Sequence, residues 1–213
     1  MLVILDWDGT VCNSEARIVD CMLRAADRAG LPVLAPEAVS NIIGLGLPEA
    51  ISSLFPEAAS EEKLTLRQLY FDEWMAARVE PLPLFEGVLD TLDQLLCGGH
   101  QLAVATGKSR QGLNREFEEH GLGHLFAASR CADETASKPD PLMLNELLHE
   151  TGTGPEQAVM VGDTVYDLEM AAAIGMPSIG VSYGAHCPTR LQGCGPKVVI
   201  DRFSELLRWP PLL

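Results

Sequence analysis

Short apolar runs that end abruptly in polar residues recur along the chain. The first, residues 1–5, stops at the segment Asp6-Trp7-Asp8-Gly9-Thr10. A continuous apolar run of this length, bounded by turn-forming residues, is typical of a strand buried on both faces of a parallel sheet. Later segments repeat the pattern and are predicted to be strands: residues 100–105, 157–161, 177–181 and 197–200.

Helical periodicity fills the stretches between these runs. Apolar residues spaced three and four apart predict helices at 86–96, 111–120, 141–150 and 167–174. Glycines follow the first and the last of these helices, as is common where a helix ends. The alternation of strand and helix predicts an α/β fold, a Rossmann-like parallel sheet with helices on both faces.

One long stretch breaks this alternation. Between Ser14 and Val79 no segment has the pattern of a strand, and prolines and the Gly44-Leu45-Gly46 turn interrupt a helical periodicity. Helices are predicted there at 17–30 and 61–78. An all-helical cap inserted directly after the first strand is the simplest account of this pattern.

The domain boundaries follow from the position of the insertion. We predict a core domain of residues 1–13 and 84–213, and a helical cap domain of residues 14–83. The two linkers, near Ser14 and Leu82, lead to the hypothesis that the cap opens and closes over the core.

Composition limits the partners of the chain. Its 213 residues carry a formal net charge of −15, which repels nucleic-acid backbones and anionic membrane surfaces, so neither is expected as a partner. No apolar run is long enough to span a membrane and the N-terminus lacks a basic segment, which predicts a cytoplasmic location. The six cysteines form no C-x-x-C pair and are expected to be reduced.

Candidate chemistry lies where the predicted strands end. Asp6 and Asp8 are one residue apart on an extended segment, so both side chains point the same way and can share a site. Gly9 allows a sharp turn of the backbone beside them. Asp163 and Asp167 lie four residues apart at a helix entrance, where they either cap the helix or supply oxygen ligands to a divalent cation.

Two further segments offer groups for a phosphate. Thr106 and Gly107 begin a Thr-Gly-Lys-Ser segment, but a nucleotide P-loop is excluded because position 102 is Leu instead of the required glycine. A hydroxyl and backbone amides at a strand end can still cradle a phosphate, or simply cap the following helix. Lys138, which precedes Pro139, is either an ordinary surface lysine or an ammonium aimed at a phosphoryl group.

Taken in their order along the chain, these segments resemble the motifs of the haloacid dehalogenase superfamily. The resemblance rests on Asp-x-Asp-Gly-Thr, hydrophobic-Thr-Gly, Lys-Pro and Gly-Asp-x-x-x-Asp, and it extends from Leu2 to about Leu206. The segments TGKS, SKPDP and VGDTVYDLEMA are similar to the phosphoglycolate phosphatase-like branch, which has a helical cap after the first strand.

The resemblance implies a Mg²⁺-dependent phosphatase that hydrolyses a small phosphate monoester through a phospho-aspartyl intermediate. Asp6 would be the nucleophile and Asp8 the acid and base. The catalytic residues would be Asp6, Asp8, Thr106 and Lys138. The metal ligands would be Asp6, Asp8 through its backbone carbonyl, Asp163 and Asp167. The substrate-binding residues would be Thr106, Gly107, Lys138 and Arg17.

The resemblance also bears on the cap and on the partners. Arg17 is the candidate substrate contact in the cap, and the turn at 44–47 resembles the family's cap loop. Trp7 departs from the smaller residue usual at its position, and its side chain is expected to point away from the aspartates and to affect packing only. The expected partner is a small phosphorylated metabolite, and the protein is expected to be a monomer or homodimer.

Several alternatives remain open. A phosphomutase would return the phosphoryl group to a sugar, and a pyrophosphatase would take pyrophosphate instead of an ester. Asp8 argues against the dehalogenases, which lack an acid there, and against the phosphonate hydrolases, which carry Ala. A phospho-accepting switch of the receiver type would be shorter and lack the cap, and a scaffold without activity would not be expected to keep every motif residue.

Overall fold

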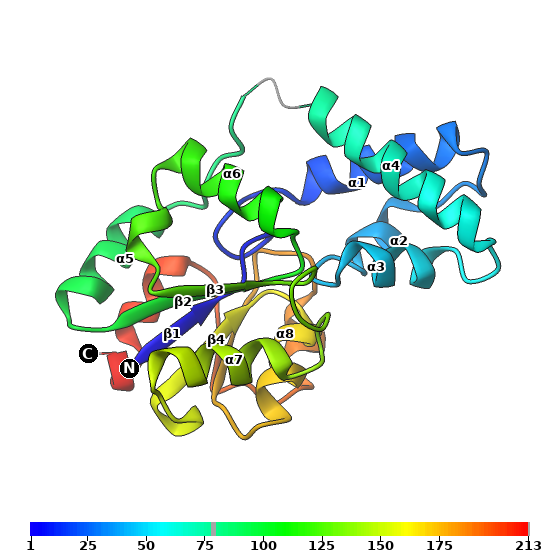
Figure 1. The fold of residues 1–213 in the computed structure, drawn as a ribbon. Helices are drawn as coiled ribbons and strands as arrows, with labels where there is room; N and C mark the ends of the chain where they lie inside the picture. The colour runs from blue at the N-terminus through cyan, green and yellow to red at the C-terminus, as the bar shows by residue number, and fades with distance from the viewer. Residues whose placement is uncertain (78–79, 213) are drawn as a thin grey trace.

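The computed structural model describes residues 1–77 and 80–212, and within them six parallel strands form one sheet in the order β3-β2-β1-β4-β5-β6 (Figure 1). The strands are β1 (Leu2–Leu5), β2 (Gln101–Thr106), β3 (Ala128–Cys131), β4 (Ala158–Gly162), β5 (Ser178–Val181) and β6 (Val198–Ile200). The five predicted strands are all present, and the Rossmann-like α/β fold is confirmed.

The strand β3 is absent from the prediction, and its place in the sheet explains why. It lies at the edge, and only its terminal residues Ala128 and Cys131 are buried. The two residues between them, Ser129 and Arg130, are polar and partly exposed. A short edge strand therefore lacks the continuous apolar run that marks the strands inside the sheet.

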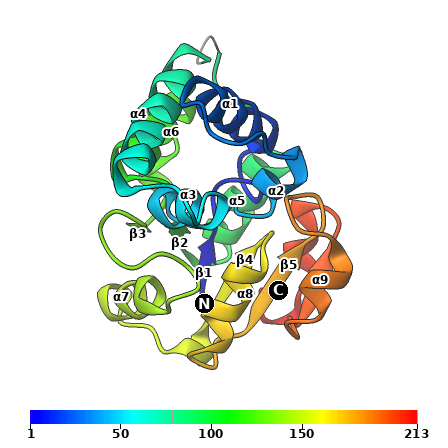
Figure 2. The ribbon, with the colours of Figure 1, turned by 90° about the vertical axis from the view of Figure 1, so that its right-hand side faces the viewer.

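Helices cover both faces of the sheet, as predicted (Figures 1 and 2). Side chains alternate along β1, so Val3 and Leu5 pack on one face, and Leu2 and Ile4 pack on the other. The first face carries α5 (Val88–Cys97), α6 (Arg110–His120) and the 3-10 segment Phe203–Arg208; the second carries α7 (Leu142–Thr151) and α8 (Val165–Ala172).

Short elements complete the core. The helix α9 (Pro188–Gln192) packs beside β5 and β6. The remaining 3-10 segments are Gly123–Leu125, Pro155–Gln157 and Pro210–Leu212. These elements were not predicted, because each is too short to show a helical period.

Four helices between β1 and α5 form the predicted helical insertion, which lies beyond the carboxyl ends of the strands (Figures 1 and 2). They are α1 (Glu15–Arg28), α2 (Pro36–Ser40), α3 (Leu47–Leu54) and α4 (Ser60–Ala76). Buried residues from all four, including Met22, Val39, Ile51 and Leu66, form their own apolar core. Arg78, predicted as the end of α4, lies outside the described residues, and the domain boundaries 14–83 stay a prediction.

Two expectations about the whole chain can be compared with the structure. The six cysteines are all free, as expected. Among the helices in the described part of the chain, none combines the length and the apolar character needed to cross a membrane.

Trp7 anchors the loop that follows β1. Its indole is fully buried on the face covered by α5 and α6, so it packs into the core as predicted. The ring meets Phe117 edge to face, with centroids 5.3 Å apart, and Phe126 at 6.1 Å. Aromatic pairs of this geometry add to the stabilisation from burial alone. The position of the two flanking aspartates therefore depends on the packing of a large side chain.

Replacing Trp7 tests this dependence. Trp7→Ala is expected to lower the free energy of unfolding by about 3–5 kcal/mol, because it leaves a large cavity in the core. Trp7→Phe should cost less, since it keeps a ring and removes an indole N–H that has no hydrogen-bond partner among the described residues. Urea unfolding of both variants measures the difference, and equal stabilities would contradict the anchoring role.

Candidate active site

The order of the strands indicates where a ligand binds. From β1 the chain proceeds to β2 and β3 on one side, and then crosses to β4, β5 and β6 on the other. In open α/β sheets, ligands bind at the carboxyl ends of the strands where the direction of the connections reverses. Asp6 follows β1 and Asp163 follows β4, so both carboxylates lie at this point of the sheet.

Buried carboxylates meet a buried ammonium there. Asp6, Asp163 and Asp167 are fully buried, and one oxygen from each lies within 4.8 Å of the others. Lys138 Nζ donates to Asp6 Oδ1 at 2.7 Å and to Asp167 Oδ1 at 2.6 Å. With every group ionised, these three carboxylates carry more charge than Lys138 balances. Buried charge is costly unless it is compensated, so the cluster requires a further cation or bound protons.

Burial, and after it the excess of negative charge, shifts the pKa values of these carboxyl groups. Burial raises the pKa of Asp6 well above its usual value, which Lys138 offsets only in part, and Asp167 raises it further. Burial and then the charge of Asp167 raise the pKa of Asp163 to about 7, although the Ala185 N–H donates to its carboxylate. For Lys138, the carboxylates of Asp167 and Asp6 outweigh the effect of burial and raise the pKa, so the lysine stays charged.

The residues present fit a divalent metal ion. Asp6 Oδ2 is buried without a hydrogen-bond partner among the described residues. A bare carboxylate oxygen beside two other carboxylates suits a hard cation such as Mg²⁺, which takes oxygen ligands. The side chain of Asp8 lies outside this cluster.

The side chain of Asp8 has hydrogen-bond partners that the clustered carboxylates do not share. Ser14 Oγ donates to Asp8 Oδ1 at 2.5 Å, and Lys108 Nζ donates to the same oxygen at 2.8 Å. Glu116 Oε1 lies 4.0 Å from Lys108 Nζ. The ammonium is thus placed between two carboxylates, close to the candidate acid and base.

Two glycines are required by close contacts at the site. Gly9 has a φ of +82°, and a Cβ on it would lie 2.2 Å from Asp163 Oδ2. A Cβ on Gly107 would lie 2.4 Å from the backbone oxygen of Leu45. The cap loop therefore rests directly on the turn that holds Thr106, whose buried hydroxyl accepts the Lys108 N–H at 3.2 Å.

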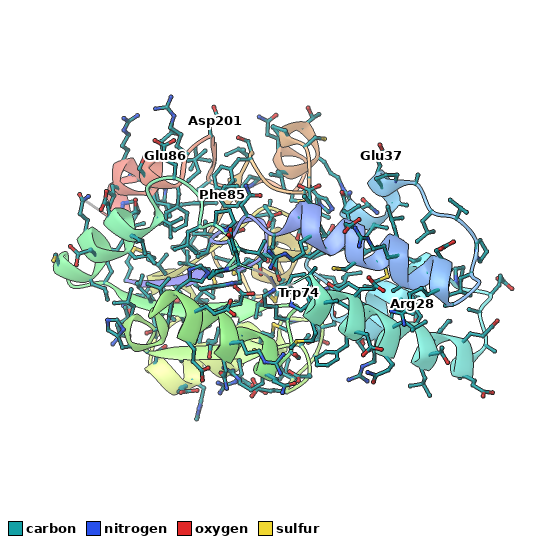
Figure 3. The ribbon with its side chains drawn as sticks, turned by 90° about the horizontal axis from the view of Figure 1, so that it is seen from above. Arg28, Glu37, Trp74, Phe85, Glu86 and Asp201 are labelled. Atoms are coloured by element: carbon teal, nitrogen blue, oxygen red, sulfur yellow. The ribbon has the colours of Figure 1, made fainter. Side chains whose placement is uncertain are left out.

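The cap contacts the core on two sides of the site. On one side, the Gly46 N–H donates to Ser137 Oγ at 2.7 Å, and the Tyr166 hydroxyl donates to the Asn41 carbonyl at 2.9 Å. On the other, the Lys108 ammonium lies 4.8 Å from the centre of the Trp74 ring, at the end of α4 nearest the core (Figure 3). These contacts dock the cap on the core.

A cavity of about 680 Å³ lies between the docked cap and the core. Its lining residues from the core include Asp6, Asp8, Thr106, Gly107 and Lys108. Asp163, Asp167 and Lys138 are not among the lining residues and lie buried behind Asp6. Of the three residues in the carboxylate cluster, Asp6 is therefore the one that lines the cavity.

Arg17, predicted to contact substrate, is not among the residues that line the cavity. Its guanidinium lies 5.9 Å from the centre of the Trp74 ring and donates to the Glu80 carbonyl at 3.2 Å. The structure thus brings the predicted core residues together and leaves Arg17 apart from them.

Sequence reasoning gave no role to several residues that position the site. The Thr10 hydroxyl donates to Asp163 Oδ1 at 2.9 Å, and the Thr164 hydroxyl donates to Asp167 Oδ2 at 2.8 Å. Both threonines stand inside the recognised motifs, which is the signal that marks them. Lys108 follows Thr106 and Gly107, but its partner Asp8 is 100 positions away in the sequence.

The raised pKa of Asp163 makes the stability of the metal-free protein depend on pH. The folded state binds this proton more tightly than the unfolded chain does, so the stabilisation is present in acid and is lost as the pH rises through about 7. Between the usual carboxyl range and that pH, Asp163 should contribute a decrease of about 1.4 kcal/mol per pH unit.

Urea unfolding at a series of pH values, with chelator and with MgCl₂, measures this effect. Asp163→Asn should remove the Asp163 contribution to the slope, and Mg²⁺ should restore wild-type stability at neutral pH more than in acid. Equal slopes for wild type and Asp163→Asn in chelator would contradict the assignment.

Comparison with known proteins agrees with this geometry. The family model for haloacid dehalogenase-like hydrolases matches residues 3–181. A Dickeya dadantii protein named "Probable phosphatase IndB" is 33% identical over 97% of this chain and 91% of its own length. A phosphoglycolate phosphatase of Aliivibrio fischeri is 31% identical over 97% of this chain and 94% of its own.

A solved structure has the same fold. A hydrolase from Pseudomonas syringae superposes with a TM-score of 0.89, at 20% identity, over 98% of this chain and 96% of that chain. The family match spans most of the sequence and contains the carboxylates described above. The chain therefore belongs to the haloacid dehalogenase-like hydrolase family.

Proposed function

We propose that this chain, a phosphoric monoester hydrolase of that family, cleaves a small organic phosphate through a phospho-aspartyl intermediate on Asp6. One observation carries the proposal: Asp6 is the member of the buried carboxylate cluster that lines the cavity, while Asp163 and Asp167 lie behind it. A nucleophile must reach the substrate, and the residues that tune its charge need not. The phosphatase relatives support the same assignment.

In the first step, a carboxylate oxygen of Asp6 attacks phosphorus and the bond from phosphorus to the ester oxygen breaks. Asp8 gives its proton to the departing alcohol, whose oxygen would otherwise leave as an alkoxide. Asp8 lines the same cavity as Asp6, which supports this pairing. In the second step, Asp8 takes a proton from water as the water oxygen attacks phosphorus, and inorganic phosphate leaves with Asp6 restored.

The remaining core residues would bind and balance the phosphoryl group. Thr106 and Gly107 lie at the end of β2 and line the cavity, where a hydroxyl and a backbone amide can donate to phosphoryl oxygens. Lys138 holds Asp6 through Oδ1 and keeps one positive charge beside it. Bound Mg²⁺, held by Asp6, Asp163, Asp167 and the Asp8 carbonyl, would supply positive charge that stabilises the transferring phosphoryl group.

The nucleophile can be tested with p-nitrophenyl phosphate. Wild-type hydrolysis is expected to require Mg²⁺, and Asp6→Asn should lower kcat by at least about 1,000-fold because the covalent route is lost. Asp8→Asn should lower kcat by about 10²–10⁴-fold, as expected for loss of acid and base catalysis. Glu49→Gln is a matched control, since it also removes a carboxylate that lines the cavity.

The outcomes separate the alternatives. Full activity of Asp6→Asn would overturn the mechanism. A wild-type enzyme that leaves esters intact but interconverts sugar phosphates would be a phosphomutase, and one that prefers inorganic pyrophosphate would be a pyrophosphatase.

A further inference from the structure

The helix α4 has two apolar faces. One face, with Leu66 and Leu69, packs into the core of the cap. The other carries Leu64 and Phe71, which line the cavity although 65% and 41% of their respective surfaces are exposed. Large apolar side chains gathered at an open cavity are a mark of a ligand-binding surface.

The spacing of this second face is that of a helix. The residues of α4 that line the cavity are Leu64, Arg67, Gln68, Tyr70, Phe71 and Trp74. Most of them recur at intervals of three and four, so they form one stripe along the helix. Other cap elements continue the apolar wall, with Ile18 and Met22 on α1, and Ile42 and Leu45 before α3.

Two arginines stand at this wall without an acidic partner in the described part of the chain. Arg67 and Arg115 both line the cavity, and neither forms an ion pair with a described carboxylate. Arg115 lies 5.9 Å from the centre of the Phe71 ring and donates to Met75 Sδ at 3.0 Å. Most of its five N–H donors therefore remain available to an anion.

Two of the acidic side chains that line the same cavity have partners of their own. Glu116 is paired with Lys108, and Asp133 accepts the Arg110 backbone N–H at 2.8 Å. In a chain with a net charge of −15, guanidinium groups left without a carboxylate partner are well suited to bind an anionic ligand.

The size of the cavity agrees with the chemistry of its wall. The contacts of Gly46 and Trp74 dock the cap on the core, so the volume of about 680 Å³ belongs to a docked cap. Cavities of roughly 300–1,000 Å³ hold ligands of drug size. A two-carbon phosphate ester at Asp6 would leave most of the apolar wall uncovered.

We propose that the substrate is a phosphate monoester whose alcohol part has a large apolar ring body and carries a second anionic group. The ring body packs against Leu64 and Phe71, and the second anion binds Arg67 and Arg115. This substrate class rests on the proposed function, because it places the phosphate of the same molecule at Asp6.

A series of primary-alcohol esters tests the substrate class, because their leaving groups are closely similar. The probes are ethyl phosphate, 2-phenylethyl phosphate, 2-(4-carboxyphenyl)ethyl phosphate and 2-phosphoglycolate. We expect kcat/KM to rise at least about tenfold from the ethyl to the phenylethyl ester through burial of the ring. The carboxylate should add about another tenfold through the arginines.

Substitutions in the cavity wall test which residues cause each increase in kcat/KM. Phe71→Ala should reduce the gain from the ring, and the double variant Arg67→Gln/Arg115→Gln should remove the gain from the carboxylate. Matched controls are Arg24→Gln and Leu89→Ala, since Arg24 is paired with Asp20 on α1 and Leu89 is 54% exposed on α5. Neither residue lines the cavity, so both controls should keep wild-type selectivity.

These experiments distinguish failure of the proposed substrate class from failure of the proposed mechanism on Asp6. Equal kcat/KM across the series, or a preference for 2-phosphoglycolate, would overturn the substrate class while leaving the mechanism on Asp6 intact. If no ester is hydrolysed, the proposed function fails, and calorimetric binding of the same esters to Asp6→Asn then decides the substrate class. Binding that is no tighter for the carboxyphenyl ester than for the ethyl ester would overturn it.

Discussion

The ammonium of Lys138, bonded to Asp6 and Asp167 and shielded from solvent, makes it possible for the carboxylates to gather at the end of the sheet. Without a cation, burial would keep these groups protonated, and a protonated carboxyl group is a poor nucleophile. Burying such charges costs free energy, and the apolar clusters on both faces of the sheet contribute the stability that offsets this cost. Burial and the neighbouring carboxylates raise the pKa values of Asp6 and Asp163, and Lys138 offsets this only in part.

The distribution of charge around the cavity bears on which ligands the site can bind. A strongly acidic chain repels anions at long range, yet the cavity gathers Lys108, Arg67 and Arg115 at its wall, with Lys138 behind it. In the proposed function, this local field would bind a small anion, and a metal ion among the carboxylates would strengthen it. In the proposed function, the core supplies the residues for the chemistry, and the apolar stripe of α4 and its neighbouring arginines would contact the part of the substrate that differs from one ester to another.

Much of this architecture could be predicted from the sequence, because the signals are local. Strands buried on both faces appear as continuous apolar runs, and the polar motifs that follow them mark the carboxyl edge of the sheet. The edge strand β3 escaped prediction, since a half-exposed strand carries Ser129 and Arg130 in place of apolar residues. The functional roles of Asp6, Asp8, Thr106 and Lys138 stay predictions, although the structure brings these residues to one place.

The sequence by itself determined the α/β fold, the helical insertion after the first strand and the motif residues that meet at the site, because periodicity and motif order are properties of neighbouring residues. Only the tertiary structure decided which distant side chains meet. It paired Lys108 with Asp8, placed Arg17 beside Trp74 but outside the set of residues that line the cavity, and turned the second apolar face of α4 toward the cavity. Such contacts depend on how whole elements pack against one another, which no local pattern along the chain records.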